Sequence, residues 1–210
     1  MRGVWNGDGW VRDGDTVVVT GGSSGIGAAT ARVFAERGCR VVVVGRSADA
    51  VQRSARRCGG VPCVADLAGP GAVDTVLDVA GEPDVLVCNA GVGGAGPLAY
   101  AGPAEVEHLV RVNLLAPALL LRAVLPGMLR RGRGHLVLVS SIAGGMAVGG
   151  EAVYSATKAG LHALAASVRH EVAGHGIGVT VVVPGAVDTA FFDRRGTPYP
   201  RRFPRPVPAG

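Results

Sequence analysis

Short apolar runs alternate with longer helical patterns along most of this chain, and no other feature limits its fold as strongly. Segments in which apolar residues recur with helical spacing lie between strand-like runs that are almost free of polar residues. Such strands must be covered on both faces, which strand–helix–strand units with right-handed crossovers achieve. The strands are expected at 16–20, 41–44, 61–64, 85–88, 135–140 and 179–183, and the helices at 26–37, 48–57, 72–80, 103–131 and 152–173. The pattern predicts an α/β fold with a doubly wound parallel sheet in one domain, 1–210.

The two ends of the chain fall outside this rhythm. Residues 1–14 form an expected N-terminal extension without the apolar core of a signal peptide. Residues 191–210 are rich in Pro and Arg. Five of the eleven positions 198–208 are proline, which argues against a helix or a central strand, so an extended surface segment is predicted.

Composition excludes several classes of function. The net charge of +5 comes from separate arginine clusters, and aromatic residues are only 4% of the chain, so neither a nucleic-acid groove nor a stacking platform is expected. The apolar stretch 109–129 is interrupted by Arg111, Asn113 and Arg122, which predicts a buried helix and not a membrane span. The four cysteines form no CxxC pair and no histidine lies at ligand spacing, which predicts free thiols, no metal site and a cytoplasmic location.

A glycine-rich turn joins the first predicted strand to the first predicted helix. Glycines permit a tight turn, close approach of the backbone to a pyrophosphate and close packing of helix on strand, while the helix N-terminus offers free N–H groups to phosphate. A glycine cluster alone is weak evidence, but at this place in an alternating chain it predicts a dinucleotide site. The candidate cofactor-binding residues are Thr20, Gly21, Ser23, Ser24, Gly25, Ile26 and Gly27.

The end of the second predicted strand bears on the choice of cofactor. Dinucleotide folds that bind NAD carry an acidic residue here, whereas a basic residue accommodates the 2′-phosphate of NADP. This chain has Arg46 and no carboxylate at that point. Arg46 favours NADP(H) over NAD(H), although a merely solvated arginine is the alternative.

Lys158 is the only lysine in the chain, and it follows Tyr154 by four residues. On a helix the two side chains share one face. A nearby ammonium favours tyrosinate and would lower the pKa of the phenol, as a general acid/base requires. The spacing therefore predicts a catalytic pair.

Together these motifs resemble the short-chain dehydrogenase/reductase family. Its pattern is Thr-Gly-x-x-x-Gly-x-Gly, then Asn-Ala-Gly, a serine and Tyr-x-x-x-Lys; here these are residues 20–27, Asn89-Ala90-Gly91, Ser141 and Tyr154 with Lys158. The likeness covers about residues 14–190. It implies a Rossmann-type sheet of strand order 3-2-1-4-5-6 and hydride transfer between NADP(H) and a carbonyl or secondary alcohol.

The resemblance also implies a role for each matching residue. Tyr154 would be the general acid/base and Ser141 would hold the substrate oxygen; Ser140 is an alternative that the spacing disfavours. Lys158 would bind the nicotinamide ribose, and Asn113 would hold a water of the proton relay. The remaining implied cofactor contacts are Asp66 and Leu67 at the adenine, Asn89, Ala90 and Gly91 along the cofactor, and Pro184, Gly185, Val187 and Thr189 at the nicotinamide.

The chain departs from the family pattern after Pro184. Family members continue with a further helix and a seventh strand, so a missing seventh strand is expected here. This leaves open an alternative: a nucleotide-binding protein with impaired catalysis.

Small apolar residues dominate the expected substrate walls at 93–100, 144–150 and 190–200, favouring an apolar alcohol or ketone. A homodimer through the helices 103–131 and 152–173 is implied by the resemblance alone.

Overall fold

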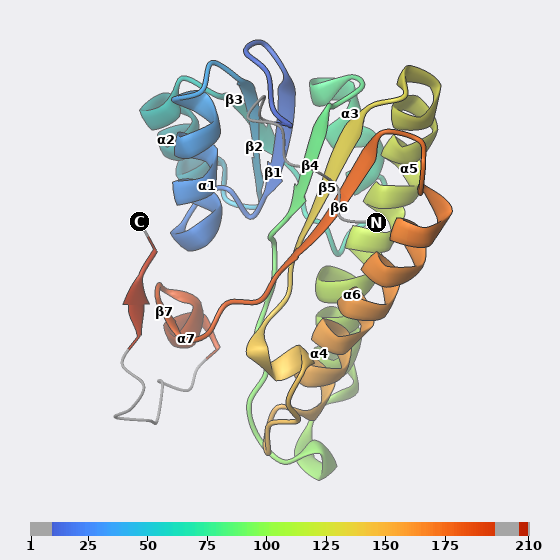
Figure 1. Ribbon diagram of the computed structural model, residues 1–210. Helices are drawn as coiled ribbons and strands as arrows, with labels where there is room; N and C mark the ends of the chain where they lie inside the picture. Colours follow the sequence, from blue (N-terminus) through green and yellow to red (C-terminus); the bar gives the residue numbers. More distant parts are fainter. Residues whose placement is uncertain (1–9, 196–205, 210) are drawn as a thin grey trace.

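A computed structural model describes residues 10–195 and 206–209 of the chain (Figure 1). Six parallel strands form one sheet in the order β3-β2-β1-β4-β5-β6, which confirms the expected topology. The predicted strands agree with the observed ones to within two residues at each end. The strands are β1 (Thr16–Thr20), β2 (Arg40–Gly45), β3 (Val61–Val64), β4 (Val85–Cys88), β5 (Gly134–Val139) and β6 (Ile177–Val182).

Helices cover both faces of the sheet. One face carries α1 (Gly25–Ala35) and α2 (Ala48–Cys58), and the other carries α3 (Ala72–Ala80), α5 (Ala116–Arg131) and α6 (Ala152–Glu171) (Figure 1). Alternate residues of β1 point to opposite faces: Val17 and Val19 pack in the cluster under α1, whereas Val18 packs in the cluster under the other helices. The valine-rich strands are thus buried on both sides, as their lack of polar residues requires.

The sequence pattern predicted one helix over residues 103–131, but the structure divides this segment and it is not one regular α-helix. A π-helical turn, Arg111–Leu115, joins α4 (Pro103–Val110) to α5, and the buried Asn113 lies within this turn. Such turns occur mostly as single turns within α-helices and are frequent at functional sites. Pro103–Arg131 is long and apolar enough to cross a membrane, but half of its most apolar window is buried within the fold. Its length and composition are therefore also those of a core helix.

The described part of the N-terminal extension packs on the sheet. The Trp10 ring stacks on the His135 ring at 4.0 Å between centroids and meets the Phe34 ring edge-on at 6.0 Å. Asp15 pairs with Arg133, whose Nη1 lies 2.9 Å from Oδ1. Residues 10–15 therefore belong to the folded domain.

The C-terminal segment differs from the prediction of an extended tail. Phe191–Arg194 form a short helix, α7, which precedes the prolines that argued against a helix. β7 (Val187–Asp188) pairs in parallel with β8 (Val207–Pro208), making a separate two-stranded sheet. The prolines at 198, 200 and 204 lie outside the described residues.

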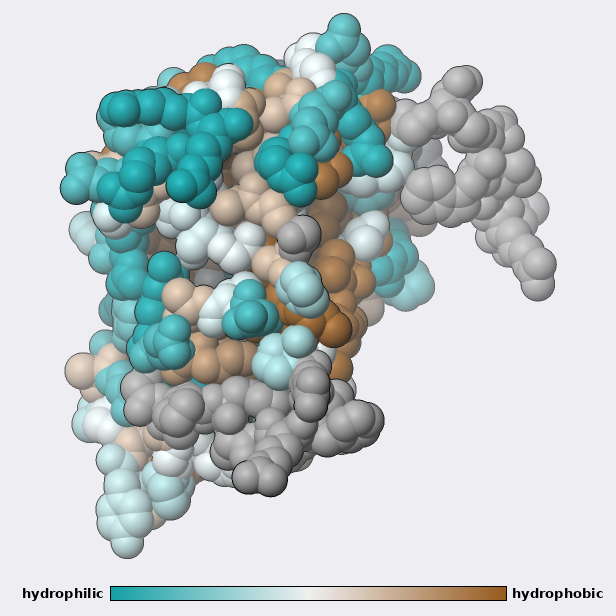
Figure 2. Space-filling model, turned by 90° about the vertical axis from the view of Figure 1, so that its left-hand side faces the viewer, coloured by the Kyte–Doolittle hydropathy of each residue, from teal (hydrophilic) through white to brown (hydrophobic). Residues whose placement is uncertain are grey.

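In the described part of the chain, β6 is the edge of the main sheet, and no seventh strand pairs with it there. Arg169 covers part of this edge because its Nε and Nη2 donate to the Val179 carbonyl at 3.2 and 3.0 Å. Val182 and Val183 at the end of β6 are 40% and 46% exposed. Figure 2 views the molecule from the side on which α1 and α2 lie in Figure 1. On this face, apolar side chains gather in one area beside a largely hydrophilic area.

Candidate functional site

The carboxyl ends of the strands open into a cleft of about 730 Å³. Ligands of open α/β sheets bind at this edge, where the strand order reverses between β1 and β4. Most of the residues that the sequence predicted for the site line this one cleft. They are Gly21, Ser23, Ser24, Gly25, Ile26, Arg46, Asp66, Leu67, Asn89, Ala90, Gly91, Ser141, Tyr154, Lys158, Pro184, Gly185, Val187 and Thr189.

Two predicted cofactor-binding residues, Thr20 and Gly27, do not line the cleft but stand behind its wall. The Thr20 hydroxyl donates to the Val87 carbonyl at 3.2 Å and accepts the N–H groups of Asn89 and Ala90, both at 3.0 Å. Gly27 lies so close to the Asn89 amide that it has no room for a Cβ. Thr20 therefore holds the Asn89 segment in place, and Gly27 leaves room for the Asn89 amide beside the glycine turn.

Asn113, predicted as catalytic, also lies behind the cleft lining and is fully buried. Its Oδ1 accepts the Val92 N–H at 2.8 Å, and its Nδ2 donates to the Val92 carbonyl at 2.9 Å. Nδ2 also donates to the Thr157 hydroxyl at 3.2 Å. The side chain thus ties the loop after β4 to α6, which accounts for an asparagine inside a helical segment.

The glycine turn leaves the start of α1 open to the cleft. Ser24 precedes the helix without a side-chain cap, so the first N–H groups and the positive end of the helix dipole face the cleft. Gly25 has φ +52°, and a Cβ there would lie 2.9 Å from Thr189 Cγ2. Only glycine meets both demands, which fits a backbone that approaches a pyrophosphate.

At the far end of the cleft, Arg46 follows β2 and Asp66 follows β3, and both are exposed. An exposed guanidinium at this place can form a charge-assisted fork with a phosphate. Asp66 Oδ1 accepts the Ala68 N–H at 3.1 Å, which shapes the turn after β3.

Tyr154 and Lys158 lie on one face of α6, as their spacing predicted. Their side chains are buried, and Lys158 Nζ lies 5.8 Å from the centre of the Tyr154 ring. Nζ donates to the Val139 carbonyl at 2.9 Å, and burial lowers the pKa of Lys158 to about 8. This ammonium lines the cleft and can donate to hydroxyl groups, and the residues present therefore fit a dinucleotide cofactor.

The expected lowering of the Tyr154 pKa by Lys158 does not occur. Burial raises the pKa of Tyr154, the hydrogen-bonding Ser141 hydroxyl opposes that rise, Glu151 adds to it and Arg195 opposes it. Desolvation outweighs the favourable partners because the phenol lies inside the fold.

The two serines after β5 have separate tasks. Ser140 Oγ donates to the Lys158 carbonyl at 2.9 Å and also contacts His162 Nε2 at 2.7 Å. Both serines line the cleft, but Ser141 is the one whose hydroxyl bonds Tyr154. The geometry therefore favours Ser141 over Ser140 as a substrate contact.

Sequence reasoning missed Glu151 and Arg195, which form an ion pair beside Tyr154. Glu151 immediately precedes α6, so its place three residues before Tyr154 was an available signal. Arg195 follows α7, and nothing in the local pattern of the chain marked it. The Phe191 ring of α7 lies 5.8 Å from the Tyr154 ring.

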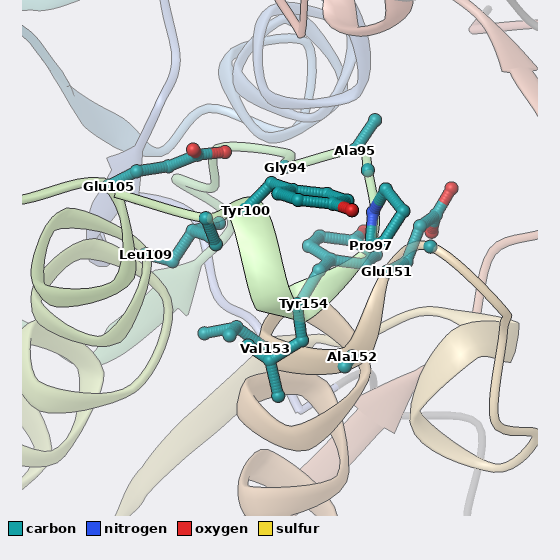
Figure 3. A pocket seen from close by; sticks show the side chains of 14 residues that line it. Gly94, Ala95, Pro97, Tyr100, Glu105, Leu109, Glu151, Ala152, Val153 and Tyr154 are labelled. Atoms are coloured by element: carbon teal, nitrogen blue, oxygen red, sulfur yellow. The ribbon is translucent and has the colours of Figure 1, made fainter. Parts of the chain in front are cut away.

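A side pocket of about 110 Å³ adjoins the cleft on the other side of Tyr154. Figure 3 shows Tyr100, Pro97 and Tyr154 grouped together, with the carboxylates of Glu105 and Glu151 on opposite sides. Tyr154 and Glu151 line both the pocket and the main cleft. The two spaces therefore meet at the tyrosine.

Comparisons with known proteins agree with this geometry. A family model described as short chain dehydrogenase matches residues 15–199. Dehydrogenase/reductase SDR family member 7B of Bos taurus is 38% identical over 188 residues, which are 82% of this chain and 58% of the bovine protein. The 3-oxoacyl-[acyl-carrier-protein] reductase FabG of Escherichia coli is 34% identical over 183 residues, covering 84% of this chain and 75% of that protein. The chain spans 58% to 64% of the length of the first three curated relatives.

Solved structures show the same similarity. A short-chain dehydrogenase from Sphingobium yanoikuyae in complex with NADPH has a TM-score of 0.86 and 31% identity, covering 93% of this chain and 79% of that one. A metagenomic short-chain oxidoreductase in complex with NADP has a TM-score of 0.78 and 42% identity, covering 84% of each chain.

Proposed function

Since the chain belongs to the short-chain dehydrogenase/reductase family, we propose that it is an NAD(P)-dependent oxidoreductase acting on a carbonyl or a secondary alcohol. The observation that carries this proposal is the meeting of Ser141, Tyr154 and Lys158 in one cleft with the glycine turn. A bound nicotinamide supplies or accepts the hydride, while the protein positions the reactants and moves the proton.

Tyr154 is the proposed proton donor to the carbonyl oxygen during reduction and the acceptor of the hydroxyl proton during oxidation. The Ser141 hydroxyl, which bonds Tyr154, is proposed to hold the same oxygen. Burial keeps the phenol protonated at neutral pH because it raises the pKa of Tyr154. A protonated phenol is a proton donor, so this chain is suited to reduction near neutral pH, and alcohol oxidation should speed up as the pH rises.

Lys158 is proposed to bind the nicotinamide ribose through its ammonium. Glu151 and Arg195 neutralise one another, and the other groups around Tyr154 include Phe191, Ala143 and Val148. These surroundings support a small, uncharged and largely apolar substrate. Arg46 supports a preference for NADP(H), because its exposed guanidinium at the end of β2 suits a 2′-phosphate.

A homodimer in the cytoplasm is the proposed state of the protein. Val110 on α4, Leu115 in the π-helical turn and Leu119 on α5 are each about 40% exposed, which supports helix packing between two copies. Light scattering of the purified chain measures its mass in solution and tests the dimer.

The first experiment titrates the chain with NADPH and with NADH by nicotinamide fluorescence, followed by a screen of carbonyl compounds. Tighter binding of NADPH than NADH is expected. Tyr154→Phe should lower kcat by about 10²- to 10⁴-fold, as loss of a general acid does, with little change in NADPH affinity.

Ser155→Ala is the matched control, since it removes a hydroxyl one residue away that has no hydrogen-bond partner within the described structure. It should leave kcat unchanged. Undiminished turnover in Tyr154→Phe contradicts the proposed mechanism, and tight NADPH binding without turnover of any carbonyl compound supports the alternative of a catalytically impaired nucleotide-binding protein.

A further inference from the structure

The short helix α7 lies directly on the reaction centre. Its first residue, Phe191, packs its ring against Tyr154 and joins the small apolar cluster of Leu109 and Ala143. At its other end, Arg195 pairs with Glu151, the residue immediately before α6. The segment 191–195 therefore contacts Tyr154 itself through Phe191 and the residue before α6 through Arg195.

The ion pair is shielded from water, since the side chains of Arg195 and Glu151 are 4% and 19% exposed. A buried pair of this kind holds its geometry firmly, because removal of the Arg195 guanidinium leaves the Glu151 carboxylate in a poorly hydrated site without that counter-charge. The Arg195 guanidinium also lies over the Phe192 ring, 5.0 Å from its centre.

Gly93, in the loop after β4, allows α7 to approach this closely. A Cβ at Gly93 would lie 2.9 Å from Phe191 Cζ and 2.9 Å from Arg195 Cδ. At the cofactor end of the cleft, Arg194 Nη1 donates to Ser24 Oγ at 3.2 Å. α7 thus touches the glycine turn, the loop after β4 and the start of α6.

We propose that the Glu151–Arg195 ion pair is a positioning element that fastens α7 over Tyr154 and thereby sets where the carbonyl substrate lies. This inference rests on the proposed oxidoreductase function. Neither residue transfers a proton or hydride; both act through the placing of Phe191 and Tyr154. Because Glu151 lines both the cleft and the side pocket, the pair also stands at the junction between the two spaces.

The pair acts electrostatically on Tyr154 as well. Glu151 raises the pKa of the phenol and Arg195 lowers it, so the two contributions oppose one another while the pair is intact. Removal of one partner removes its contribution to the Tyr154 pKa and leaves that of the other partner in place. The titratable and charged groups that line the side pocket or the cleft together with Tyr154 are Arg46, Asp66, Tyr100, Glu105, His108, Glu151, Lys158, Arg194 and Arg195.

Two single variants, Glu151→Gln and Arg195→Met, test the proposal. Each should lower kcat/KM for carbonyl reduction by about 10²-fold through a raised KM, because α7 no longer holds the substrate in position beside Tyr154. The alkaline limb of the pH profile should move to lower pH in Glu151→Gln and to higher pH in Arg195→Met. A purely structural role predicts no such opposite movement, and movement of both profiles in the same direction overturns the proposal.

Hydrogen exchange supplies a readout that needs no turnover. The amides of Arg194 and Arg195 donate to the carbonyls of Ala190 and Phe191. Both amides should exchange about tenfold faster in the two single variants, because local opening of α7 becomes easier. The double variant Glu151→Arg with Arg195→Glu should restore the protection, and a folded double variant that exchanges as fast as the singles overturns the proposal.

The exposed ion pair on α1 supplies the matched control. Arg32 and Glu36 lie 2.9 Å apart and are more than half exposed, so Arg32→Met and Glu36→Gln should change neither kinetics nor exchange at α7. If the wild-type protein reduces no carbonyl compound, the proposed function fails while faster exchange in the variants still supports the fastening of α7. Wild-type turnover with unchanged KM and unchanged exchange in both variants refutes the positioning role alone.

Discussion

Lys158→Met should stabilise the fold at neutral pH while abolishing function, because the buried lysine is held at a cost in stability. Burial lowers the pKa of Lys158 from its ordinary value of 10.5 to about 8. At about 1.4 kcal/mol for each pKa unit, the charged side chain costs the folded state about 3 kcal/mol. Replacement by Met also loses the hydrogen bond from the charged Nζ to the Val139 carbonyl, worth about 2 kcal/mol, so a net gain of about 1 kcal/mol is expected.

The sign of the pH dependence follows from proton binding. Below pH 8 both the folded and the unfolded chains carry a protonated lysine, and the full cost is present. Between pH 8 and 10.5 the unfolded chain binds more protons than the folded chain, so the free energy of unfolding of the wild type rises with pH. Other groups are common to both proteins, and the advantage of Lys158→Met should therefore disappear as the pH approaches 10.5.

Urea unfolding of both proteins without cofactor, repeated from about pH 6.5 to about pH 10, measures this difference. Since Lys158 is the only lysine of the chain, its ¹³Cε resonance is a single signal whose titration reports the pKa directly. A signal that titrates at its ordinary value, together with parallel stability curves, would refute the reasoning. Loss of NADPH affinity in the stabilised variant would show that stability is given up for the site.

Two further predictions concern residues that support the cleft. Asn113→Ala should lower the free energy of unfolding by about 2–4 kcal/mol, because it removes the side-chain partner of both the N–H and the carbonyl of Val92. Urea denaturation measures this change. An unchanged denaturation midpoint contradicts the bracing role of Asn113. Gly25→Ala should weaken NADPH binding about tenfold, because φ +52° disfavours a side chain and the new Cβ meets Thr189. Fluorescence titration checks that result, and wild-type affinity would show that the turn accommodates a side chain.

Local patterns in the sequence determined most of the architecture. Apolar valine runs placed β1 and β2, and the glycine turn after β1 marked the site, because strand burial and tight turns constrain the residues that form them. The four-residue spacing of Tyr154 and Lys158 placed both on one face of α6, because helix geometry alone determines which residues share a face. The family pattern could be recognised for the same reason: its motifs are short and contiguous.

Only the tertiary structure decided the interactions between distant segments. Glu151 and Arg195 are 44 residues apart, and no local pattern announced their pairing or the approach of α7 to the cleft. Asn113 was recognised as unusual within a helix, but its partner Val92 became known only from the fold.

The tertiary structure also reversed the expected direction of the Tyr154 pKa. Helical spacing predicts that Lys158 lies near the phenol, and this is correct. Burial depends on every element that packs around the phenol, however, and here desolvation outweighs the nearby charges. The sequence by itself thus determined that Tyr154 and Lys158 share one face of α6, whereas packing decided their protonation, because solvent exclusion is a property of the whole fold.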